Sequence, residues 1–171
     1  MKNNLSKIIL LCGVPASGKS TYADMLARKI KYKIECADTW RGILSRTGDE
    51  SDQSNNKVIF DNFLPHAIKK HLADKKTKGV IIDVTAYNKK NRNTWLNFAR
   101  ENNVDIDCHW FEPDEERSLL WNSKRIRKVP EQYIKKQISE FMEPSCGEGF
   151  KNVYKIEIID MGVMKKFVLP V

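Results

Sequence analysis

The chain has 171 residues, of which 41% are hydrophobic and 30% are charged. This composition is typical of one soluble globular domain with its own core, and it excludes a small scaffold that depends on disulfides. No long apolar run follows residues 1–6, and the four cysteines form no C-x-x-C pair. We therefore expect no signal peptide, membrane span or zinc site, and we predict a cytoplasmic protein with reduced thiols. The net charge of +8 modestly favours a polyanionic partner, either nucleic acid or several phosphates.

A glycine-bounded loop follows the first apolar run, and residues 13–20 read G-x-x-x-x-G-K-S. Gly13 lets the chain turn sharply, and Gly18 lets the backbone come close to a phosphate oxygen. The N–H groups of the loop then face an anion at the start of a helix. The pattern predicts a nucleoside triphosphate site, with Lys19 on the β- and γ-phosphates and Ser20 on Mg²⁺.

Apolar periodicity predicts alternating strands and helices along the chain. The expected strands are 7–12, 33–36, 79–85, 104–111, 153–159 and 165–168. The expected helices are 19–31, about 38–46, 57–75, 88–102, one that begins at Pro113, and 131–143. Asp38 or Thr39 would cap the second helix, Pro65 would kink or divide the third, and the helix from Pro113 has a strongly basic far end (Lys124, Arg125, Arg127, Lys128). Residues 47–56 read as an exposed loop, and 161–162 as a hairpin turn. This alternation predicts an α/β fold with a mainly parallel sheet covered by helices on both faces.

Ligands bind beyond the carboxyl ends of the strands in sheets of this kind. Three segments follow strands at that edge: the loop 13–21, Asp38, and residues 85–88. We therefore expect these segments to surround one crevice.

Several motifs together resemble the kinase domain of the phage-type polynucleotide 5′-kinases. They are G-x-P-x-S-G-K-S-T at 13–21, the aspartate and arginine of D-x-x-R at 38–41, V-I-I-x-x-T-x-x-N at 80–88, and N-S-K-R…V-P at 122–130. Residues 143–150 also look like the E-P-P-x-x-x-E-G-F stretch of the wider family, with a serine for the second proline. The likeness runs in one order from about residue 7 to 156. It implies a P-loop kinase fold formed by a single domain over residues 1–171, with a helical lid at about 113–130.

The resemblance also implies a reaction, the ATP- and Mg²⁺-dependent transfer of the γ-phosphoryl group to the 5′-hydroxyl of DNA or RNA in nucleic-acid repair. It makes Asp38 the base that accepts the hydroxyl proton, Arg41 a contact to the 3′-phosphate of the acceptor, and Arg125 a lid residue that closes on the phosphates. With Lys19 these form the expected catalytic set. The expected nucleotide-binding residues are Gly13, Ala16, Ser17, Gly18, Lys19, Ser20, Thr21, Arg125 and Arg127, with Ser20 also at the metal.

Four further positions depart from the pattern of this family. Ala16 replaces a glycine in the loop, so its φ must suit a residue with a Cβ. Ala86 stands where the family has asparagine, and Trp121 stands where a lid arginine is expected. Asp83 lies one residue before the family's strand-three carboxylate, and a shift of one residue changes the strand face; its role is therefore left open.

Other functions remain open from the residues alone. Without the resemblance, Asp38 reads equally well as a helix cap. A surface cation is the less favoured alternative for Arg41, and a solvated helix end is the less favoured alternative for the basic residues of the expected lid. The loop also suits a kinase for a small-molecule alcohol, such as a sugar or nucleoside, or a nucleotide- or nucleic-acid-binding module without catalysis. The residues indicate no membrane partner, and they do not separate DNA from RNA or identify protein partners.

Overall fold

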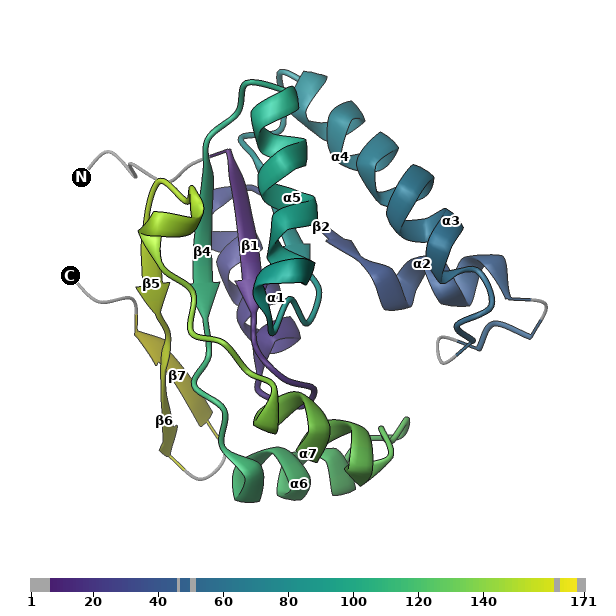
Figure 1. The fold of residues 1–171 in the computed structure, drawn as a ribbon, viewed down its shortest axis with the longest axis vertical. Coiled ribbons are helices and arrows are strands. Elements are labelled where there is room, and N and C mark those ends of the chain that lie inside the picture. Colours follow the sequence, from purple (N-terminus) through teal and green to yellow (C-terminus); the bar gives the residue numbers. More distant parts are fainter. Residues whose placement is uncertain (1–6, 46, 50–51, 162–163, 169–171) are drawn as a thin grey trace.

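The computed structural model describes residues 7–45, 47–49, 52–161 and 164–168. Within them, five strands form one sheet in the order β2-β3-β1-β4-β5, and every neighbouring pair is parallel (Figure 1). The strands are β1 Ile8–Cys12, β2 Lys33–Cys36, β3 Val80–Asp83, β4 Ile106–Trp110 and β5 Val153–Lys155. The predicted α/β class with a parallel sheet is confirmed.

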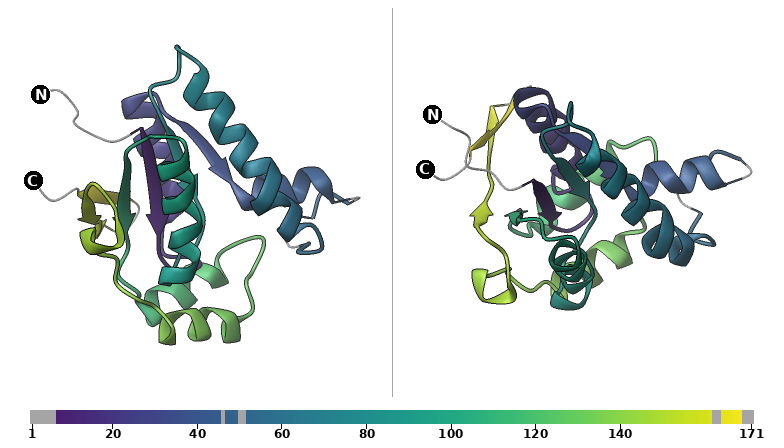
Figure 2. Two further views of the ribbon diagram at one scale, coloured as in Figure 1. Left: turned by 45° about the horizontal axis from the view of Figure 1, so that its top comes forward. Right: turned by 90° about the horizontal axis from the view of Figure 1, so that it is seen from above.

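Helices cover both faces of this sheet (Figures 1 and 2). The helical segments are α1 Lys19–Ile30, α2 Ala37–Leu44, α3 Asn56–Val58, η1 Ile59–Phe63, α4 Leu64–Ala73, α5 Lys89–Glu101, α6 Glu115–Ser123, α7 Glu131–Ser139 and η2 Cys146–Glu148. Side chains alternate between the faces of β1: Ile9 and Leu11 pack with α1, whereas Ile8 and Leu10 pack with α4 and α5. Because both faces are covered, β1 is apolar throughout and fully buried.

The helical run that contains Pro65 changes its geometry just before the proline. Segment η1 is a π-helix, in which the Leu64 N–H bonds to the Ile59 carbonyl five residues back. A regular α-helix would bring the proline ring against the carbonyl four residues earlier. The wider turn relieves this clash, so the predicted division at Pro65 takes the form of a π-turn.

Three predicted helix boundaries are wrong. Helix α7 ends at Ser139, four residues before the predicted end at 143. Helix α2 begins at Ala37 with Cys36 as its N-cap, so neither Asp38 nor Thr39 caps it. Strand β2 leads directly into α2, which places Asp38 in the first helical turn. Helix α6 ends at Ser123, so the basic residues 124–128 lie in the connection to α7 and do not form a helix end.

The predicted closing strand at 153–159 is divided in the structure. Residues 153–155 extend the parallel sheet as β5, whereas β6 Glu157–Met161 pairs antiparallel with β7 Met164–Val168. The predicted hairpin is therefore present, and the second residue of its expected turn, 162, lies outside the described residues. No helix in the described part of the chain has the length and apolar character that a membrane crossing needs.

His109 of β4 is fully buried between two tyrosine rings, those of Tyr22 and Tyr154. The Tyr22 hydroxyl lies 2.7 Å from Nδ1, and Nε2 has no hydrogen-bond partner among the described residues. Burial lowers the pKa of His109 to about 3, so the imidazole is neutral at pH 7.

The free energy of unfolding is expected to fall as the pH is lowered from about 6.5 toward 3. The unfolded chain takes up a proton at residue 109 in this range, whereas the folded protein does not, and the loss is about 1.4 kcal/mol per pH unit. Urea unfolding between pH 7 and pH 4 measures it. The variant His109→Gln has no group that titrates there, so its pH dependence should be flatter. Parallel curves for the two proteins would contradict the assignment.

Candidate active site

The phosphate-binding loop connects β1 to α1 at the carboxyl edge of the sheet. The Gly13 N–H donates to the Thr85 carbonyl at 2.9 Å, which fastens the loop to the segment after β3. A Cβ on Gly13 would lie 2.9 Å from Ser17 Oγ and 3.2 Å from Phe111 Cβ, so a larger residue would force the loop or these side chains to shift. Gly18 has a φ of 92° and precedes Lys19, the first residue of α1. The loop therefore suits a phosphate group, which helix N-termini of this kind bind through backbone N–H groups.

Ala16 adopts the left-handed conformation inside this loop, with a φ of 57°. A residue with a Cβ pays about 1–2 kcal/mol in this region relative to the right-handed one. The glycine expected here from the sequence resemblance would avoid this strain, and the alanine of this chain adopts the conformation despite it.

The variant Ala16→Gly is expected to raise the free energy of unfolding by up to about 1 kcal/mol, because relief of the strain outweighs the greater chain entropy of glycine. Chemical denaturation measures the change. Ala27→Gly in α1 is the matched control, and it should lower stability by about 1 kcal/mol because that residue is helical. A loss of stability in both variants would contradict the account of Ala16.

Lys19 is buried inside the loop. Its ammonium donates to the Val14 carbonyl at 2.6 Å and to Ser17 Oγ at 3.2 Å. Burial lowers the pKa of Lys19, and the nearby Asp83 carboxylate opposes that shift. Two neutral oxygens now hold the ammonium, and phosphate oxygens are stronger acceptors for it. The loop and Lys19 therefore fit a nucleoside triphosphate.

Asp83 ends β3 beside Ser20, whose hydroxyl hydrogen-bonds to its carboxylate. Burial raises the pKa of Asp83, whereas Lys19 and the bond from Ser20 lower it. The next residue, Val84, packs into the hydrophobic core. The carboxylate at position 83 therefore faces the phosphate loop, although the family pattern places it one residue later. An acidic residue at the end of an apolar strand was the signal in the sequence for this position.

Ser20 and Asp83 offer hydroxyl and carboxylate oxygens, which are the ligand types that Mg²⁺ prefers. No group of three or more His, Cys, Asp or Glu side chains in the described residues is arranged to hold a metal ion. Mg²⁺ takes few protein ligands and completes its shell with phosphate and water, so the oxygens of Ser20 and Asp83 fit this ion.

Asp38 contacts an arginine on each of its carboxylate oxygens. Arg41, one turn later on α2, donates from Nη1 to Oδ1, and Arg127 of the lid lies 3.1 Å from Oδ2. Arg41 also donates from Nε to Asn56 Oδ1 at 2.7 Å. Asp38 is therefore a bridge between α2 and the lid, and Arg41 is held in place on two sides.

The segment expected to form a lid, residues 113–130, contains α6 and the turn that leads to α7, and with α7 it lies beyond the carboxyl ends of β1 and β4 (Figure 1). Asn122 shapes this turn, because its side-chain amide donates to the Val129 carbonyl at 2.8 Å and accepts from the Val129 N–H at 2.9 Å. The turn carries Arg127 to Asp38. It also carries Arg125, whose side chain is exposed and whose charge lies near enough to Lys19 to lower its pKa.

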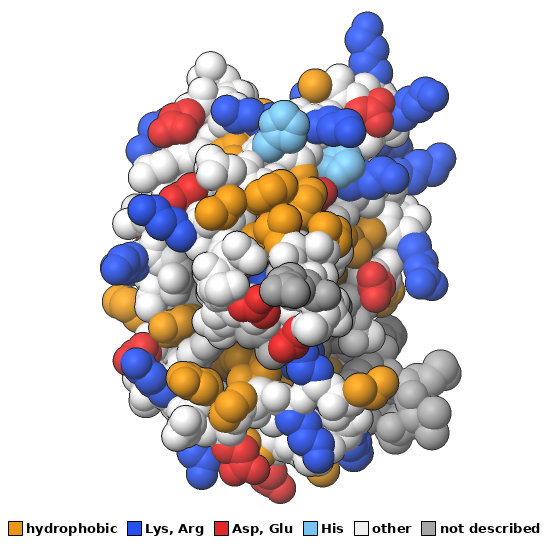
Figure 3. All heavy atoms as spheres, turned by 90° about the vertical axis from the view of Figure 1, so that its right-hand side faces the viewer, with side chains coloured by type: hydrophobic (Ala, Val, Ile, Leu, Met, Phe, Trp, Pro, Cys, Tyr) orange, Lys and Arg blue, Asp and Glu red, His pale blue; other side chains and the backbone are white. Residues whose placement is uncertain are grey.

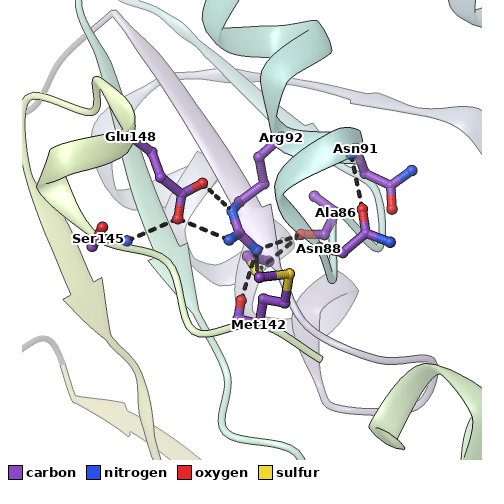
Figure 4. A network of polar contacts seen from close by, with 8 residues as sticks. Ala86, Asn88, Asn91, Arg92, Met142, Ser145 and Glu148 are labelled. Carbon is purple, nitrogen blue, oxygen red and sulfur yellow. Dashed lines mark hydrogen bonds and ion pairs between the residues drawn. The ribbon is translucent and has the colours of Figure 1, made fainter. Parts of the chain in front are cut away.

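Arg92 and Glu148 form a buried ion pair behind the loop (Figure 4). Arg92 donates from Nε and Nη2 to the two carboxylate oxygens at 2.7 and 2.8 Å. Its Nη1 donates to the carbonyls of Met142 at 2.8 Å and Ala86 at 3.3 Å, and Glu148 also accepts from the Ser145 N–H. One guanidinium thereby holds the segment after α7 against the segment after β3.

The segments that this pair joins contain two features noted in the sequence. Ala86 has a φ of 42°, a conformation that asparagine, the residue expected here from the resemblance, adopts more readily than other residues with a Cβ. The E-G-F part of the stretch at 143–150 supplies Glu148 and the buried Phe150. Sequence reasoning did not identify Arg92, although a charged residue three positions before Trp95 on an apolar helix face was a usable signal.

The structure thus brings most of the expected site residues to one edge of the sheet. Lys19, Ser20 and Asp83 form one group at the loop, and Asp38, Arg41 and Arg127 form a second group between α2 and the lid. Ala16 and Ser17 lie within the loop, and Thr21 is exposed in the first turn of α1. Trp121, which stands where an arginine was expected, does not replace that cation. Its ring lies 5.6 Å from the guanidinium of Arg117.

Comparison with known proteins identifies related chains. A family model described as "AAA domain" matches residues 8–144. A bifunctional polynucleotide phosphatase/kinase of Schizosaccharomyces pombe is 28% identical over 160 residues, which are 91% of this chain and 34% of that protein. An L-seryl-tRNA(Sec) kinase of Methanococcus maripaludis is 27% identical over 140 residues, 80% of this chain and 53% of that protein. The chain therefore spans about a third to a half of the length of these relatives.

A solved structure, that of the Pnkp1/Rnl/Hen1 RNA repair complex, contains a chain with a similar fold. The TM-score is 0.67 at 23% identity, over 82% of this chain and 46% of that chain. At this identity the likeness supports a shared fold.

Proposed function

The chain belongs to the AAA domain family, and on this premise we propose that it transfers the γ-phosphoryl group of ATP to the 5′-hydroxyl end of DNA or RNA. The expected resemblance to P-loop kinases of the polynucleotide kinase type is confirmed. One observation carries the choice of acceptor. The carboxylate of Asp38, paired with Arg41 and Arg127, lies on the helix after β2, at the same sheet edge as the phosphate loop.

The phosphate loop and the residues around it bind the donor ATP. When bound, ATP supplies the phosphoryl group and Mg²⁺ neutralises part of its charge. Lys19 holds phosphate oxygens with its ammonium, and Ser20 holds the cation with its hydroxyl, which Asp83 orients. Arg125 and Arg127 add positive charge from the lid. Phosphoryl transfer depends mainly on such positioning and charge neutralisation.

Residues of α2 activate the acceptor hydroxyl. Asp38 accepts the proton of the attacking 5′-hydroxyl, and the two arginines orient its carboxylate for this role. Arg41 presents a planar guanidinium that matches the 3′-phosphate of the same nucleotide.

A second candidate acceptor is a hydroxyl group that is not at a polynucleotide end. A relative at 27% identity is named as a kinase of L-seryl-tRNA(Sec), so related chains differ in acceptor. A small alcohol, such as a sugar or nucleoside, is a further acceptor of this second kind. A competition assay with labelled ATP separates these candidates. The acceptors offered together are a 5′-hydroxyl DNA oligonucleotide, its RNA counterpart, a nucleoside and a sugar. We expect the oligonucleotides to take the label, and a small alcohol that outcompetes them would overturn the proposal. Tight oligonucleotide binding without any turnover would instead indicate a non-catalytic binding module.

A further inference from the structure

A pocket of about 440 Å³ lies outside the transfer site, where α2 meets η1 and α4. Its apolar lining comes from Trp40, Phe63 and Pro65, and Asp61, Asn62, His66 and Lys69 complete it. Figure 3 shows hydrophobic side chains gathered on this face of the molecule, with histidine and basic side chains along their upper border. We refer to this feature as the α2–α4 pocket.

The aromatic wall of the α2–α4 pocket is fixed before any ligand arrives. The Trp40 indole donates from Nε1 to Glu35 Oε2 at 2.9 Å, and the other oxygen of the buried Glu35 lies 2.9 Å from His71 Nε2. The Phe63 ring packs against the indole with the ring centroids 5.1 Å apart and the planes 36° from each other. Rigid aromatic surfaces of this kind bind flat ligands with little loss of conformational entropy.

The polar residues of the pocket fit one nucleotide. Lys69 is exposed and supplies a cation for a phosphate group, and His66 lies beside it on α4. Asp61 and Asn62 offer an acceptor and an amide to the edge of a base. The negative charge of Asp61 disfavours a bare phosphate inside the pocket, so the pocket suits the base and its rim suits the backbone. Stacking faces combined with positive charge are typical of single-strand binding surfaces.

Helix α2 connects this pocket to the transfer site. At the transfer site, Asp38 contacts Arg127 and Arg41 contacts Asn56. At the pocket, Trp40 contacts Glu35 and Phe63. A strand with its 5′ end at Asp38 can therefore continue along α2 to the pocket. Resting on the function proposed above, we propose that the α2–α4 pocket is an acceptor subsite that stacks one base of a single-stranded nucleic acid on Trp40 and Phe63, with Lys69 on its backbone.

Binding of a fluorescently labelled single-stranded oligonucleotide, measured by anisotropy without ATP, tests this subsite. Phe63→Ala is expected to weaken binding about 10-fold through loss of a stacking face. Lys69→Ala should weaken it several-fold and reduce the salt dependence by about one released ion. Lys29→Ala, an exposed lysine on α1 across the sheet, is the matched charge control and should change the affinity less than Lys69→Ala.

The outcomes distinguish the subsite from the reaction. Weaker binding in both pocket variants supports the subsite even if no label reaches a 5′ end. Unchanged binding in Lys69→Ala, whose side chain is exposed, overturns it even if the protein is an active 5′-kinase. A dimer in sedimentation that Phe63→Ala dissociates, with unchanged oligonucleotide binding, would assign the pocket to a second copy of the chain and also overturn the proposal.

Discussion

Replacement of Asp38 by alanine is expected to lower kcat for phosphoryl transfer by about 10²–10⁴-fold, the usual contribution of a general base. The affinity for ATP should change little, because the loop, Lys19 and Ser20 hold the donor on the other side of the site. Steady-state phosphorylation of a 5′-hydroxyl oligonucleotide and direct titration with ATP measure the two effects separately.

Two further variants sharpen this result. Asp38→Asn keeps the size of the side chain and removes its basicity, so it should be nearly as inactive as the alanine variant. Asp105→Ala removes an exposed carboxylate that pairs with Lys151 at the opposite, amino end of β4, and it should retain full activity. Equal loss of transfer and of ATP binding in the Asp38 variants would show that this residue supports the fold of the site rather than the reaction.

Replacement of Glu148 by alanine is expected to lower the free energy of unfolding by about 3–5 kcal/mol. The variant leaves the guanidinium of Arg92, which is 0% exposed, without the carboxylate that accepts two of its hydrogen bonds, and an unpaired buried charge carries a penalty of this size. Urea unfolding with and without the substitution measures the loss.

The double variant Arg92→Met/Glu148→Met is the control for this explanation. It removes both charges together, so it should be less destabilised than Glu148→Ala alone. A double variant that loses as much stability as Arg92→Met and Glu148→Met combined would mean that packing and carbonyl contacts, rather than the buried charge, dominate the energetics of this pair.

The fold class followed from local patterns. The loop at 13–20, the apolar run before it and the periodicity after it are properties of neighbouring residues, and the structure has β1 and α1 where these patterns predict them. Pro65 likewise predicted a disturbed helix. The geometry of that disturbance, a π-turn at η1, depends on how the chain packs, which local periodicity does not encode.

Features of the site that depend on tertiary contacts were harder to predict from the sequence. The position of Asp83 depends on which face the end of β3 presents, and a one-residue shift in a family pattern obscures it. The contact of Arg127 with Asp38 joins residues that are distant in the sequence. The start of α2 was missed because capping rules assume a turn before the helix, whereas β2 runs directly into it.

The proposed activity is the transfer of phosphate to a 5′-hydroxyl polynucleotide end. Its most direct test is the incubation of the protein with γ-labelled ATP, Mg²⁺ and a single-stranded 5′-hydroxyl oligonucleotide, followed by mapping of the label. We predict label on the 5′-terminal oxygen, none on an otherwise identical oligonucleotide that already carries a 5′-phosphate, and none with Lys19→Ala, which lacks the loop ammonium. Absence of label from the 5′ end, or equal labelling of the two oligonucleotides, would contradict the claim.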